Sequence, residues 1–525
     1  MTAPDAPGGL VLKSAAGRWA LLATVLGSGM AALDATVVNV ALPRIGADLD
    51  AGLTSLQWTL NGYTLTLSGL LLLGGSLGDR LGRRRIFSLG VLWFAIASAG
   101  CAAAPNVQLL IGMRALQGVA AALLMPGSLA ILEAVFRRED RAAAVGAWSG
   151  LGGIATAIGP VVGGLLVGMA PWGWRLVFLL NLPLAAVVMA VAAKWVPETR
   201  DEQAGGRLDL PGAGFAAVGL GALIYALTEG PVRRWPASLM VTGAAGVLLL
   251  VAFAVNEHRR PDPMMPLSLF RSRQFSAANL VTFLVYAALS GAFFLLPVQL
   301  QLVSGFTPVA AGSSLLPVTV VMLLLSARMG RLAQRIGPRW PMTFGPVLAG
   351  IGLAMLVRVG AGSGYLTAVL PAVLVFALGL TATVAPLTAT VLAAAPERQV
   401  GVASAVNNAV ARTAGLLAVA VLPALAGLTP AALDHPAALS AGFHHAVLIT
   451  AALCIAGGLL AGATISDRVL AGAEDPGAVA SAGSHPAAEP PPPSPVEPVE
   501  PVEPVDPVEP VDPVERARRA KAGTE

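Results

Sequence analysis

The stretch Gly75-Ser-Leu-Gly-Asp-Arg-Leu-Gly-Arg-Arg-Arg85 returns 255 positions later as Gly330-Arg-Leu-Ala-Gln-Arg-Ile-Gly-Pro-Arg339. Gly, Leu, Arg, Gly and Arg recur at the same offset, and the same 255 positions separate Val145-Gly146 from Val400-Gly401. Many transporter folds consist of such repeated halves, which enclose a central cavity. The repeat therefore predicts two homologous bundles of helices.

The composition is that of a membrane protein. Of the 525 residues, 56% are apolar and only 12% are charged, and the mean hydropathy is +0.75, whereas soluble domains carry about 25% charged residues. A water-soluble protein is excluded, because the chain lacks the charge to solvate its surface. Unbroken apolar runs of about 20 residues favour helices over a β-barrel, whose alternating strands span about 10 residues.

Fourteen apolar runs are long enough to cross about 30 Å of hydrocarbon. They fall near residues 19–43, 55–77, 87–105, 107–131, 142–168, 173–195, 210–229, 237–256, 275–302, 309–329, 341–360, 366–391, 400–424 and 443–464. We therefore expect an all-α integral membrane protein of two six-helix bundles plus two extra central helices. The expected divisions are an N-terminal segment 1–18, a first bundle 19–195, a linker 196–274 that contains the extra pair, a second bundle 275–465 and a tail 466–525.

Arginine and lysine residues set the expected orientation. With the N-terminus in the cytoplasm, 22 basic residues of the loops fall inside and five fall outside, as the positive-inside rule requires. Both termini are then cytoplasmic. Because the richness in Ala, Arg and Pro suggests a GC-rich bacterial source, we expect a multi-pass protein of the bacterial plasma membrane.

The tail beyond residue 466 has a different composition. Glu-Pro-Val and Asp-Pro-Val repeat from Val496 to Val514, and proline at every third residue favours extended polyproline II over a packed fold. We expect a solvated cytoplasmic spacer, with a partner-binding tail as the alternative.

The repeated loop contains residues that could act as a cytoplasmic latch. Its glycines permit tight turns, and Asp79 can cap a helix and pair with an arginine in one bundle arrangement but not in another. A plain positive-inside loop would explain the arginines but not the fixed glycines and aspartate. The second copy has Gln334 in place of Asp79. The candidate latch residues are Gly75, Asp79, Arg80, Gly82, Arg83 and Arg84.

A charged side chain inside an apolar run indicates a structural or functional role, because inserting it into the bilayer centre costs at least about 2.5 to 3.5 kcal/mol. Asp34 is the only acidic residue well inside any run. It lies eight positions before Leu42 in an outward run, and Arg114 lies eight positions after Asn106 in an inward run. At 1.5 Å per residue both lie about 12 Å below the outer boundary. A change in their separation or hydration would load or release a proton; a permanent ion pair is the alternative.

Further polar and glycine residues mark candidate sites in later runs. The sequence offers no acidic partner for Arg412. Its candidate contacts are backbone carbonyls, water or an anionic group of the substrate. In the fifth run, glycines four positions apart permit close helix packing, and a proline introduces a bend. Generic packing of small residues is the alternative reading of this run. Its candidate residues are Gly159, Pro160, Gly163 and Gly164.

The order of several motifs resembles the major facilitator superfamily, and its fourteen-helix drug:proton antiporter branch in particular. The resemblance covers roughly residues 18 to 465 and includes the loop at 75–85. The other motifs are Leu33-Asp34-Ala-Thr36-Val-Val-Asn39-Val-Ala41-Leu42-Pro43, Arg114-Ala-Leu-Gln117-Gly118, Gly159-Pro160-Val-Val-Gly163-Gly164 and Trp174-Arg175-Leu-Val-Phe178-Leu-Leu-Asn181-Leu-Pro183.

The resemblance implies a proton-coupled antiporter that exports lipophilic drugs, antibiotics or related metabolites. Asp34 would carry the proton, and Arg114 would adjust the affinity of Asp34 for that proton. Asn39, Gln117 and Arg412 are possible residues of the substrate cavity. The fifth run would be the antiporter signature, although Ala155 stands where the family usually has another glycine.

Two other functions stay open as alternatives. One is an uptake carrier or uniporter for a small metabolite on the same fold, and the other is a transporter-like sensor or membrane enzyme. An enzyme would need a convergent catalytic cluster, which the runs do not supply. We expect no metal, because the five histidines lack metal-ligand spacing, and neither an ATP-binding loop nor a CxxC pair is present. No cofactor or nucleic acid is expected. The expected partners of a monomer are a small lipophilic substrate, protons and the lipid bilayer.

Overall fold

The computed structural model describes residues 9–200, 209–260, 263–396 and 399–467. The predicted spacer lies outside the described residues from 468 onward. Within the described ranges every regular element is a helix, and the one β-bridge is isolated and joins Leu10 to Phe136.

The first bundle contains seven helices, of which α6 and α7 together form one span. Their bounds are α1 (Ala15–Asp48), α2 (Leu53–Leu81), α3 (Arg83–Ala103), α4 (Val107–Val135), α5 (Arg138–Met169), α6 (Trp174–Leu179) and α7 (Asn181–Trp195). Helix α2 packs along α4. The two backbones approach so closely that a Cβ added at Gly118 would meet the Tyr63 carbonyl oxygen.

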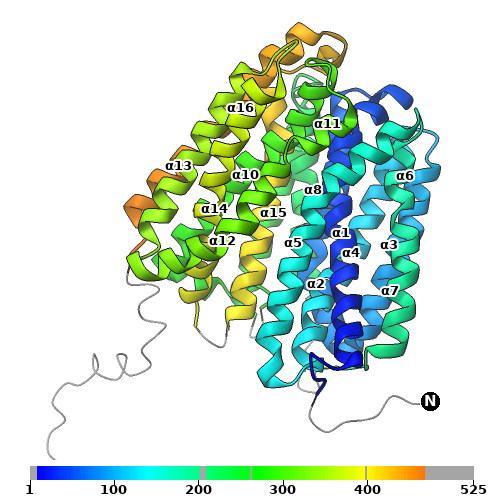
Figure 1. Cartoon of the computed structure of the whole chain (residues 1–525), viewed down its shortest axis with the longest axis vertical. Helices are drawn as coiled ribbons and strands as arrows, with labels where there is room; N and C mark the ends of the chain where they lie inside the picture. The colour runs from blue at the N-terminus through cyan, green and yellow to red at the C-terminus, as the bar shows by residue number, and fades with distance from the viewer. Residues whose placement is uncertain (1–8, 201–208, 261–262, 397–398, 468–525) are drawn as a thin grey trace, which may run out of the picture. The chain divides into compact units, whose positions relative to one another are not determined.

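The extra pair and the second bundle follow. The extra helices are α8 (Leu210–Glu229) and α9 (Ala237–Arg259), and the short η1 (Leu267–Arg271) precedes the second bundle. The second bundle contains α10 (Arg273–Leu302), α11 (Pro308–Ser313), α12 (Leu316–Ile336), α13 (Arg339–Met355) with η2 (Leu356–Arg358), η3 (Tyr365–Val369) with α14 (Leu370–Ala393), α15 (Val400–Leu425), η5 (Pro430–Asp434) and α16 (Pro436–Thr464). Figure 1 shows the helices of each bundle running side by side.

The predicted all-α, multi-span fold is confirmed. Thirteen helical segments among the described residues are long and apolar enough to cross a membrane, and they coincide with thirteen of the fourteen predicted runs. The remaining run, 55–77, is α2, which has 29 residues and spans about 44 Å. It is less apolar than the others because polar side chains such as Gln57 and Asn61 interrupt its first half.

Several helices extend beyond the predicted apolar runs. Helix α1 covers Ala15–Asp48 instead of 19–43, and Ser14 caps it by accepting a hydrogen bond from the Gly17 N–H at 3.0 Å. The reason is physical: helical hydrogen bonding continues through polar residues at the membrane boundary, where hydropathy has already fallen.

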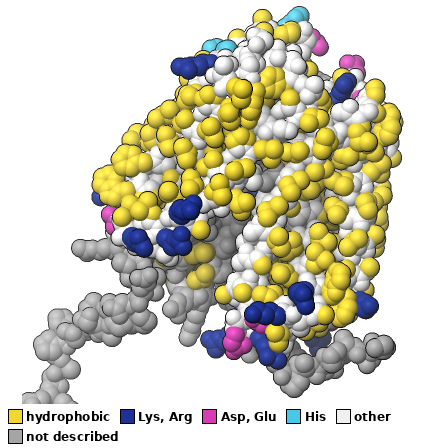
Figure 2. All heavy atoms as spheres, in the orientation of Figure 1, with side chains coloured by type: hydrophobic (Ala, Val, Ile, Leu, Met, Phe, Trp, Pro, Cys, Tyr) yellow, Lys and Arg dark blue, Asp and Glu magenta, His cyan; other side chains and the backbone are white. Residues whose placement is uncertain are grey.

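Basic residues gather at one end of the helices. We call this the arginine-rich end and define it by Arg83, Arg84 and Arg138 in the first bundle and by Arg331 and Arg335 in the second. Figure 2 shows basic clusters on both bundles at this end.

Two glutamine side chains join the bundles by hydrogen bonds at the opposite end. Gln57 near the start of α2 donates to the Val419 carbonyl of α15 at 2.6 Å. Gln301 near the end of α10 donates to the Val40 carbonyl of α1 at 3.0 Å. The bundles therefore meet at the end opposite the arginines.

An acidic cluster ties the extra helices together at the arginine-rich end. Asp209 caps α8 by accepting a hydrogen bond from the Gly212 N–H at 2.8 Å, and it also accepts one from Asn256 Nδ2 at 2.9 Å and forms an ion pair with Arg260. Glu257 accepts a hydrogen bond from the Met265 N–H at 2.8 Å. The sequence analysis missed this cluster.

The stability of this cluster is expected to depend on pH. Burial acts to raise the pKa of Asp209, but hydrogen bonds from Glu257 and the Gly212 N–H and the charge of Arg260 outweigh it, so this pKa lies below its ordinary value of 3.8. The ionised carboxylate therefore adds stability above pH 3.8 that is lost as the pH falls through the lower, folded-state pKa.

Asp209→Asn is expected to lower the free energy of unfolding at pH 7 by about 1.5 to 3 kcal/mol, the net value of a hydrogen bond to a charged group. The measurement is thermal unfolding of the purified protein in detergent at pH 7 and at pH 3. The difference from the parent should shrink at pH 3. Asp434→Asn, at an exposed carboxylate with no ion pair among the described residues, should show neither effect; an equal loss in both variants would contradict the prediction.

Candidate functional site

Asp34 of α1 and Arg114 of α4 form a buried ion pair in the first bundle. The Asp34 side chain is 0% exposed and that of Arg114 is 1% exposed. Arg114 also donates from Nη1 to Gln117 Oε1 at 2.8 Å and from Nε to the Thr59 carbonyl of α2 at 3.1 Å. The equal depths calculated from the sequence are consistent with this pairing.

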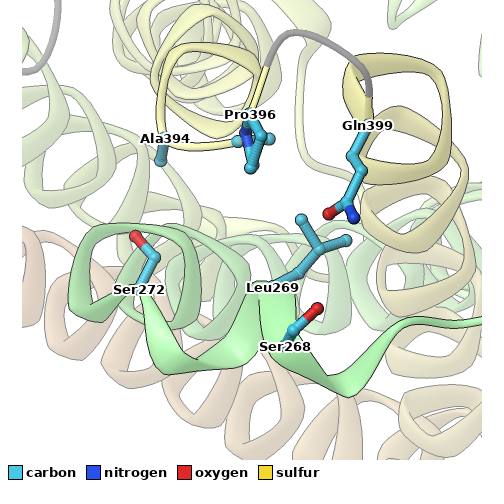
Figure 3. Close-up of a pocket in the computed structure, with 7 residues that line it drawn as sticks. Ser268, Leu269, Ser272, Ala394, Pro396 and Gln399 are labelled. Atoms are coloured by element: carbon cyan, nitrogen blue, oxygen red, sulfur yellow. The ribbon is translucent and has the colours of Figure 1, made fainter.

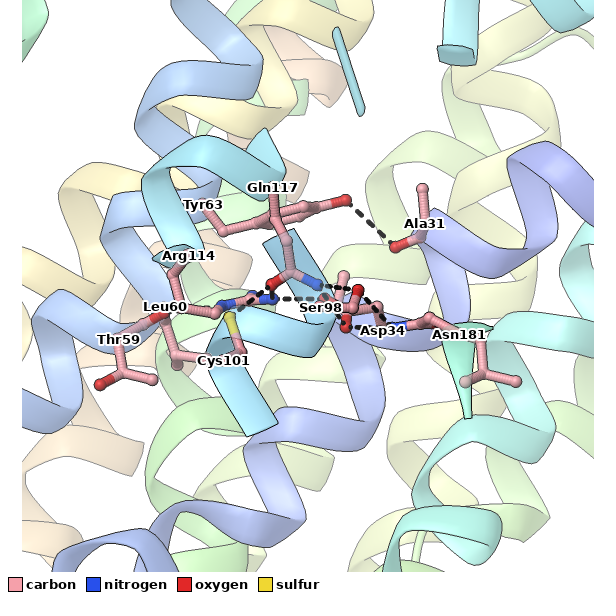
Figure 4. Close-up of polar contacts among 12 residues, drawn as sticks. Ala31, Asp34, Thr59, Leu60, Tyr63, Ser98, Cys101, Arg114, Gln117 and Asn181 are labelled. Atoms are coloured by element: carbon pink, nitrogen blue, oxygen red, sulfur yellow. Dashed lines mark hydrogen bonds and ion pairs between the residues drawn. The ribbon is translucent and has the colours of Figure 1, made fainter. Parts of the chain in front are cut away.

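Two amides hold the other oxygen of the carboxylate. Asp34 Oδ1 accepts hydrogen bonds from Asn181 Nδ2 at 3.0 Å and from Gln117 Nε2 at 3.3 Å. Both amides also donate to Ser98 Oγ of α3, at 3.2 Å and 2.7 Å respectively. Figure 4 shows these side chains converging from α1, α3, α4 and α7. The carboxylate thus has a full set of donors as long as it is ionised.

Asn181 has one further property within this network. Its Oδ1 is buried and has no hydrogen-bond partner among the described residues. An amide can rotate to present its oxygen instead of its nitrogen. The Asn181 amide can therefore donate to Asp34, as it does here, or turn its oxygen toward a donor.

An aromatic face covers the guanidinium group of Arg114. Its Cζ lies 4.4 Å from the centroid of the Tyr63 ring and 5.9 Å from that of Phe178. Cation–π contacts of this kind stabilise a desolvated guanidinium. The Tyr63 hydroxyl donates to the Ala31 carbonyl at 3.2 Å, which fixes the ring between α1 and α4.

The three residues predicted for the substrate cavity lie in different places. Gln117 is fully buried inside the Asp34 network. Asn39 is half-buried on α1, and its Nδ2 donates to the Ala35 carbonyl at 3.5 Å. Arg412 of α15 is half-buried and reaches the first bundle, where its Nη2 lies 3.5 Å from Met125 Sδ of α4.

The candidate latch residues interact within the first bundle. Asp79 Oδ1 pairs with Arg83 Nη2 at 2.8 Å, over a separation of four residues. Gly82 has a φ of 109°, which favours glycine, and a Cβ there would lie 2.7 Å from Glu198 Oε1. Gly75 lies on α2 beside Pro126.

Glu198, which the sequence analysis missed, caps the helix that starts after this loop. Its Oε1 and Oε2 accept hydrogen bonds from the Arg84 and Arg85 N–H groups at 3.0 Å and 3.1 Å. The Arg84 side chain also bonds to this segment, because its Nη1 donates to the Val196 carbonyl at 3.0 Å. The segment after α7 therefore holds the loop in place.

The second bundle repeats this arrangement. Gly337 has a φ of 86°, and Asp467 Oδ1 accepts a hydrogen bond from the Arg339 N–H at 3.2 Å. Glu198 and Asp467 each lie three positions after the last helix of their bundle, which ends at Trp195 and Thr464 respectively. We call these two residues the closing caps.

Glu198→Ala is expected to destabilise the first bundle by about 1 kcal/mol, the typical cost of losing a helix cap. Two N–H groups at the start of α3 would lose their acceptor. Thermal unfolding in detergent measures the effect. Glu133→Ala is the matched control, because Glu133 is exposed and makes no ion pair among the described residues. Equal melting temperatures for the two variants would contradict a capping role.

The glycines of the fifth predicted run lie between two neighbouring helices. A Cβ at Gly159 or Gly163 would collide with α1, at Thr36 and Val37 respectively. A Cβ at Gly164 would meet the Pro308 carbonyl oxygen of α11 at 2.5 Å. The same helix thus packs against its own bundle on one face and against the second bundle on another. Pro160 lies on that second face, where its carbonyl approaches Gly312 of α11.

A separate pocket lies far along the chain from the ion pair. It has a volume of about 430 Å³ and is formed by η1 and the segment between α14 and α15. Figure 3 shows Ser268, Leu269 and Ser272 on one side and Ala394, Pro396 and Gln399 on the other. None of these lining residues is charged, and none belongs to the Asp34 network.

Comparisons with known proteins identify the family of this chain. The family model described as Major Facilitator Superfamily matches residues 24–420. The chain is 37% identical to the methylenomycin A resistance protein of Streptomyces coelicolor, over 79% of this chain and 87% of that protein. It is 35% identical to the tetracenomycin C resistance and export protein of Streptomyces glaucescens, over 80% of this chain and 79% of that protein.

A solved structure shows the same fold. It is a bacterial homologue of the human lysosomal transporter Spinster in an inward-facing, unoccupied conformation, and the TM-score is 0.63. The alignment covers 88% of this chain and 98% of that chain at 18% identity.

Proposed function

The chain belongs to the Major Facilitator Superfamily, and from this premise we propose that it exports lipophilic drugs, antibiotics or related metabolites in exchange for protons. It is a multi-pass membrane transporter and not an enzyme. Relatives at 35% to 37% identity are named as antibiotic resistance and export proteins. They support an export function, while the buried Asp34–Arg114 pair is the observation that supports proton coupling.

We place the arginine-rich end in the cytoplasm of a bacterial cell, with both termini on that side. The positive-inside rule supports this orientation. The bundles would then be joined at the outer end by the contacts of Gln57 and Gln301. In this arrangement the substrate would enter from the cytoplasm or the inner leaflet.

The proton would bind at Asp34. A proton on the carboxylate removes the charge that holds Arg114, and it adds an O–H group that needs an acceptor. Rotation of the Asn181 amide would supply that acceptor, because its Oδ1 has no other partner among the described residues. Arg114 would keep its contacts with Thr59 and Tyr63, so that the pair can close again when the proton leaves.

The substrate would bind between the bundles, where Arg412 and Asn39 remain partly accessible. Asp34 is the only acid well inside a span, and it is already paired. Neutral, zwitterionic, anionic or singly cationic lipophiles are therefore better matched than compounds with two separated positive charges. We propose that a single chain carries out transport, since both bundles belong to the same chain.

Transport by everted membrane vesicles tests this proposal. A panel of fluorescent lipophilic drugs is added outside, and an imposed gradient, acidic inside, should drive their accumulation. A protonophore should abolish it. Accumulation without a proton gradient would contradict proton coupling. Movement only in the reverse direction, from vesicle interior to medium, would favour the uptake carrier instead.

A further inference from the structure

The proline near the outer end of α15 leaves one backbone carbonyl without its helical donor. Pro423 lies inside α15 and has no N–H, so the carbonyl four residues earlier, that of Val419, lacks an intrahelical hydrogen bond. Gln57 of α2 fills this vacancy from the other bundle. Its Nε2 donates to the Val419 carbonyl at 2.6 Å and to the Ala420 carbonyl at 3.2 Å.

The surroundings make this hydrogen bond important. The Gln57 side chain is 5% exposed, and Ala420 belongs to a buried apolar cluster with Leu416, Leu220 and Ile224. A carbonyl without a partner in such an apolar site is costly. The Val419 carbonyl therefore needs Gln57 whenever α2 and α15 are together and water is excluded.

We propose that Gln57 and the proline-released carbonyl of Val419 form a clasp that positions α2 against α15 and holds the outer end of the transporter closed. This inference rests on the proposed function, because export requires the outer ends to separate. When they separate, water can reach the Val419 carbonyl and replace Gln57. The Val419 carbonyl then accepts a hydrogen bond in both states. The donor is water when the outer ends are apart, and it is Gln57 when they are closed.

The other glutamine that bonds across the bundles provides a matched control. Gln301 donates to the Val40 carbonyl of α1. The helical donor to Val40 is the N–H of Arg44, which is not a proline. The loss of Gln301 therefore leaves a carbonyl that still has a partner in its own helix.

The test is a double-mutant cycle on the conformational equilibrium. Spin labels at Thr54→Cys and Leu425→Cys, in a chain with Cys101 and Cys454 replaced by serine, report the separation of the outer ends by double electron–electron resonance. Gln57→Leu is expected to raise the ratio of open to closed outer ends about tenfold, which corresponds to about 1.4 kcal/mol. Gln301→Leu should raise it less than Gln57→Leu.

Pro423→Ala supplies the missing N–H, so Gln57 should lose its importance in that background. There Gln57→Leu is expected to change the ratio less than twofold. An equal effect in both backgrounds, or no effect of Gln57→Leu in the parent, would overturn the proposal. If Pro423→Ala does not yield folded protein, Pro423→Gly restores the same N–H and replaces it in the cycle.

This readout separates the clasp from the function of the transporter. The distance measurement needs neither a substrate nor a proton gradient. A shifted ratio in a protein that fails to export any compound would support the clasp and contradict export. Normal export with an unshifted ratio would support export and contradict the clasp.

Discussion

Asp34→Asn is expected to abolish uphill export while leaving downhill movement of the substrate intact. Asparagine fills the same space, and its oxygen can still accept hydrogen bonds from Asn181 and Gln117, but its amide nitrogen cannot accept one from Arg114, and the side chain cannot take up a proton. One proton moved through a potential of 100 mV supplies about 2.3 kcal/mol, enough for a substrate gradient of roughly 50-fold. The variant should reach a gradient of one. The measurement is the steady-state accumulation ratio in everted vesicles at equal protein levels.

Glu133→Gln is the control for this experiment. Glu133 is also acidic and lies near the end of α4, but it is exposed. It should keep the full gradient. If Asp34→Asn still concentrates the substrate, the proton is carried elsewhere and the ion pair with Arg114 has a structural role alone.

Arg114→Met is expected to lower the stability of the protein strongly. It removes the partner of a carboxylate that is 0% exposed, and breaking a buried pair from one side costs about 3 to 5 kcal/mol. The free energy of unfolding should fall by that amount or the protein should fail to accumulate in the membrane. Thermal unfolding in detergent, with size-exclusion chromatography as a check on folding, measures it.

The double variant separates charge from packing. Asp34→Asn together with Arg114→Met leaves no unpaired charge, so it should recover most of the lost stability without recovering uphill export. Arg412→Met provides a comparison, because Arg412 makes no ion pair among the described residues and its loss should cost less. A double variant as unstable as Arg114→Met would show that the guanidinium acts through its contacts with Thr59 and Tyr63 instead.

The overall fold was largely predictable because hydrophobic runs and the 255-residue repeat are properties of the sequence. The class, the order of the spans and the extra pair at 210–256 follow from them. Helix ends did not follow, since α1 continues through polar residues to Asp48. Helix α2 shows the other limit of hydropathy: its polar residues make it the least apolar of the predicted spans.

The ion pair was predictable in part. Counting residues from the membrane boundary placed Asp34 and Arg114 at one depth, and depth is fixed by the helical rise. The rotation of each helix about its axis is fixed by packing with several neighbours, which one sequence does not reveal. For that reason Asn181 and Ser98 were missed as partners of the network, and Gln117 was assigned to the cavity although it lies inside the network.

The missed residues left different traces in the sequence. The capping role of Glu198 and Asp467 could be predicted, since each is an acidic residue shortly after the last helix of a repeated half. Pro423 also left a trace, because a proline inside a helix frees a carbonyl. The donor to that carbonyl, Gln57, comes from 362 positions away, and no local pattern connects the two.

The closing caps also bear on the order in which the protein is made. Each bundle receives its cap from the segment that leaves the ribosome directly after its last helix, so neither half depends on the other to complete its own loop. At about 5 to 20 residues per second, the first half has Glu198 in place roughly 15 to 50 s before Asp467 is synthesised. The early half can thus finish folding in the membrane while the later half is still being inserted.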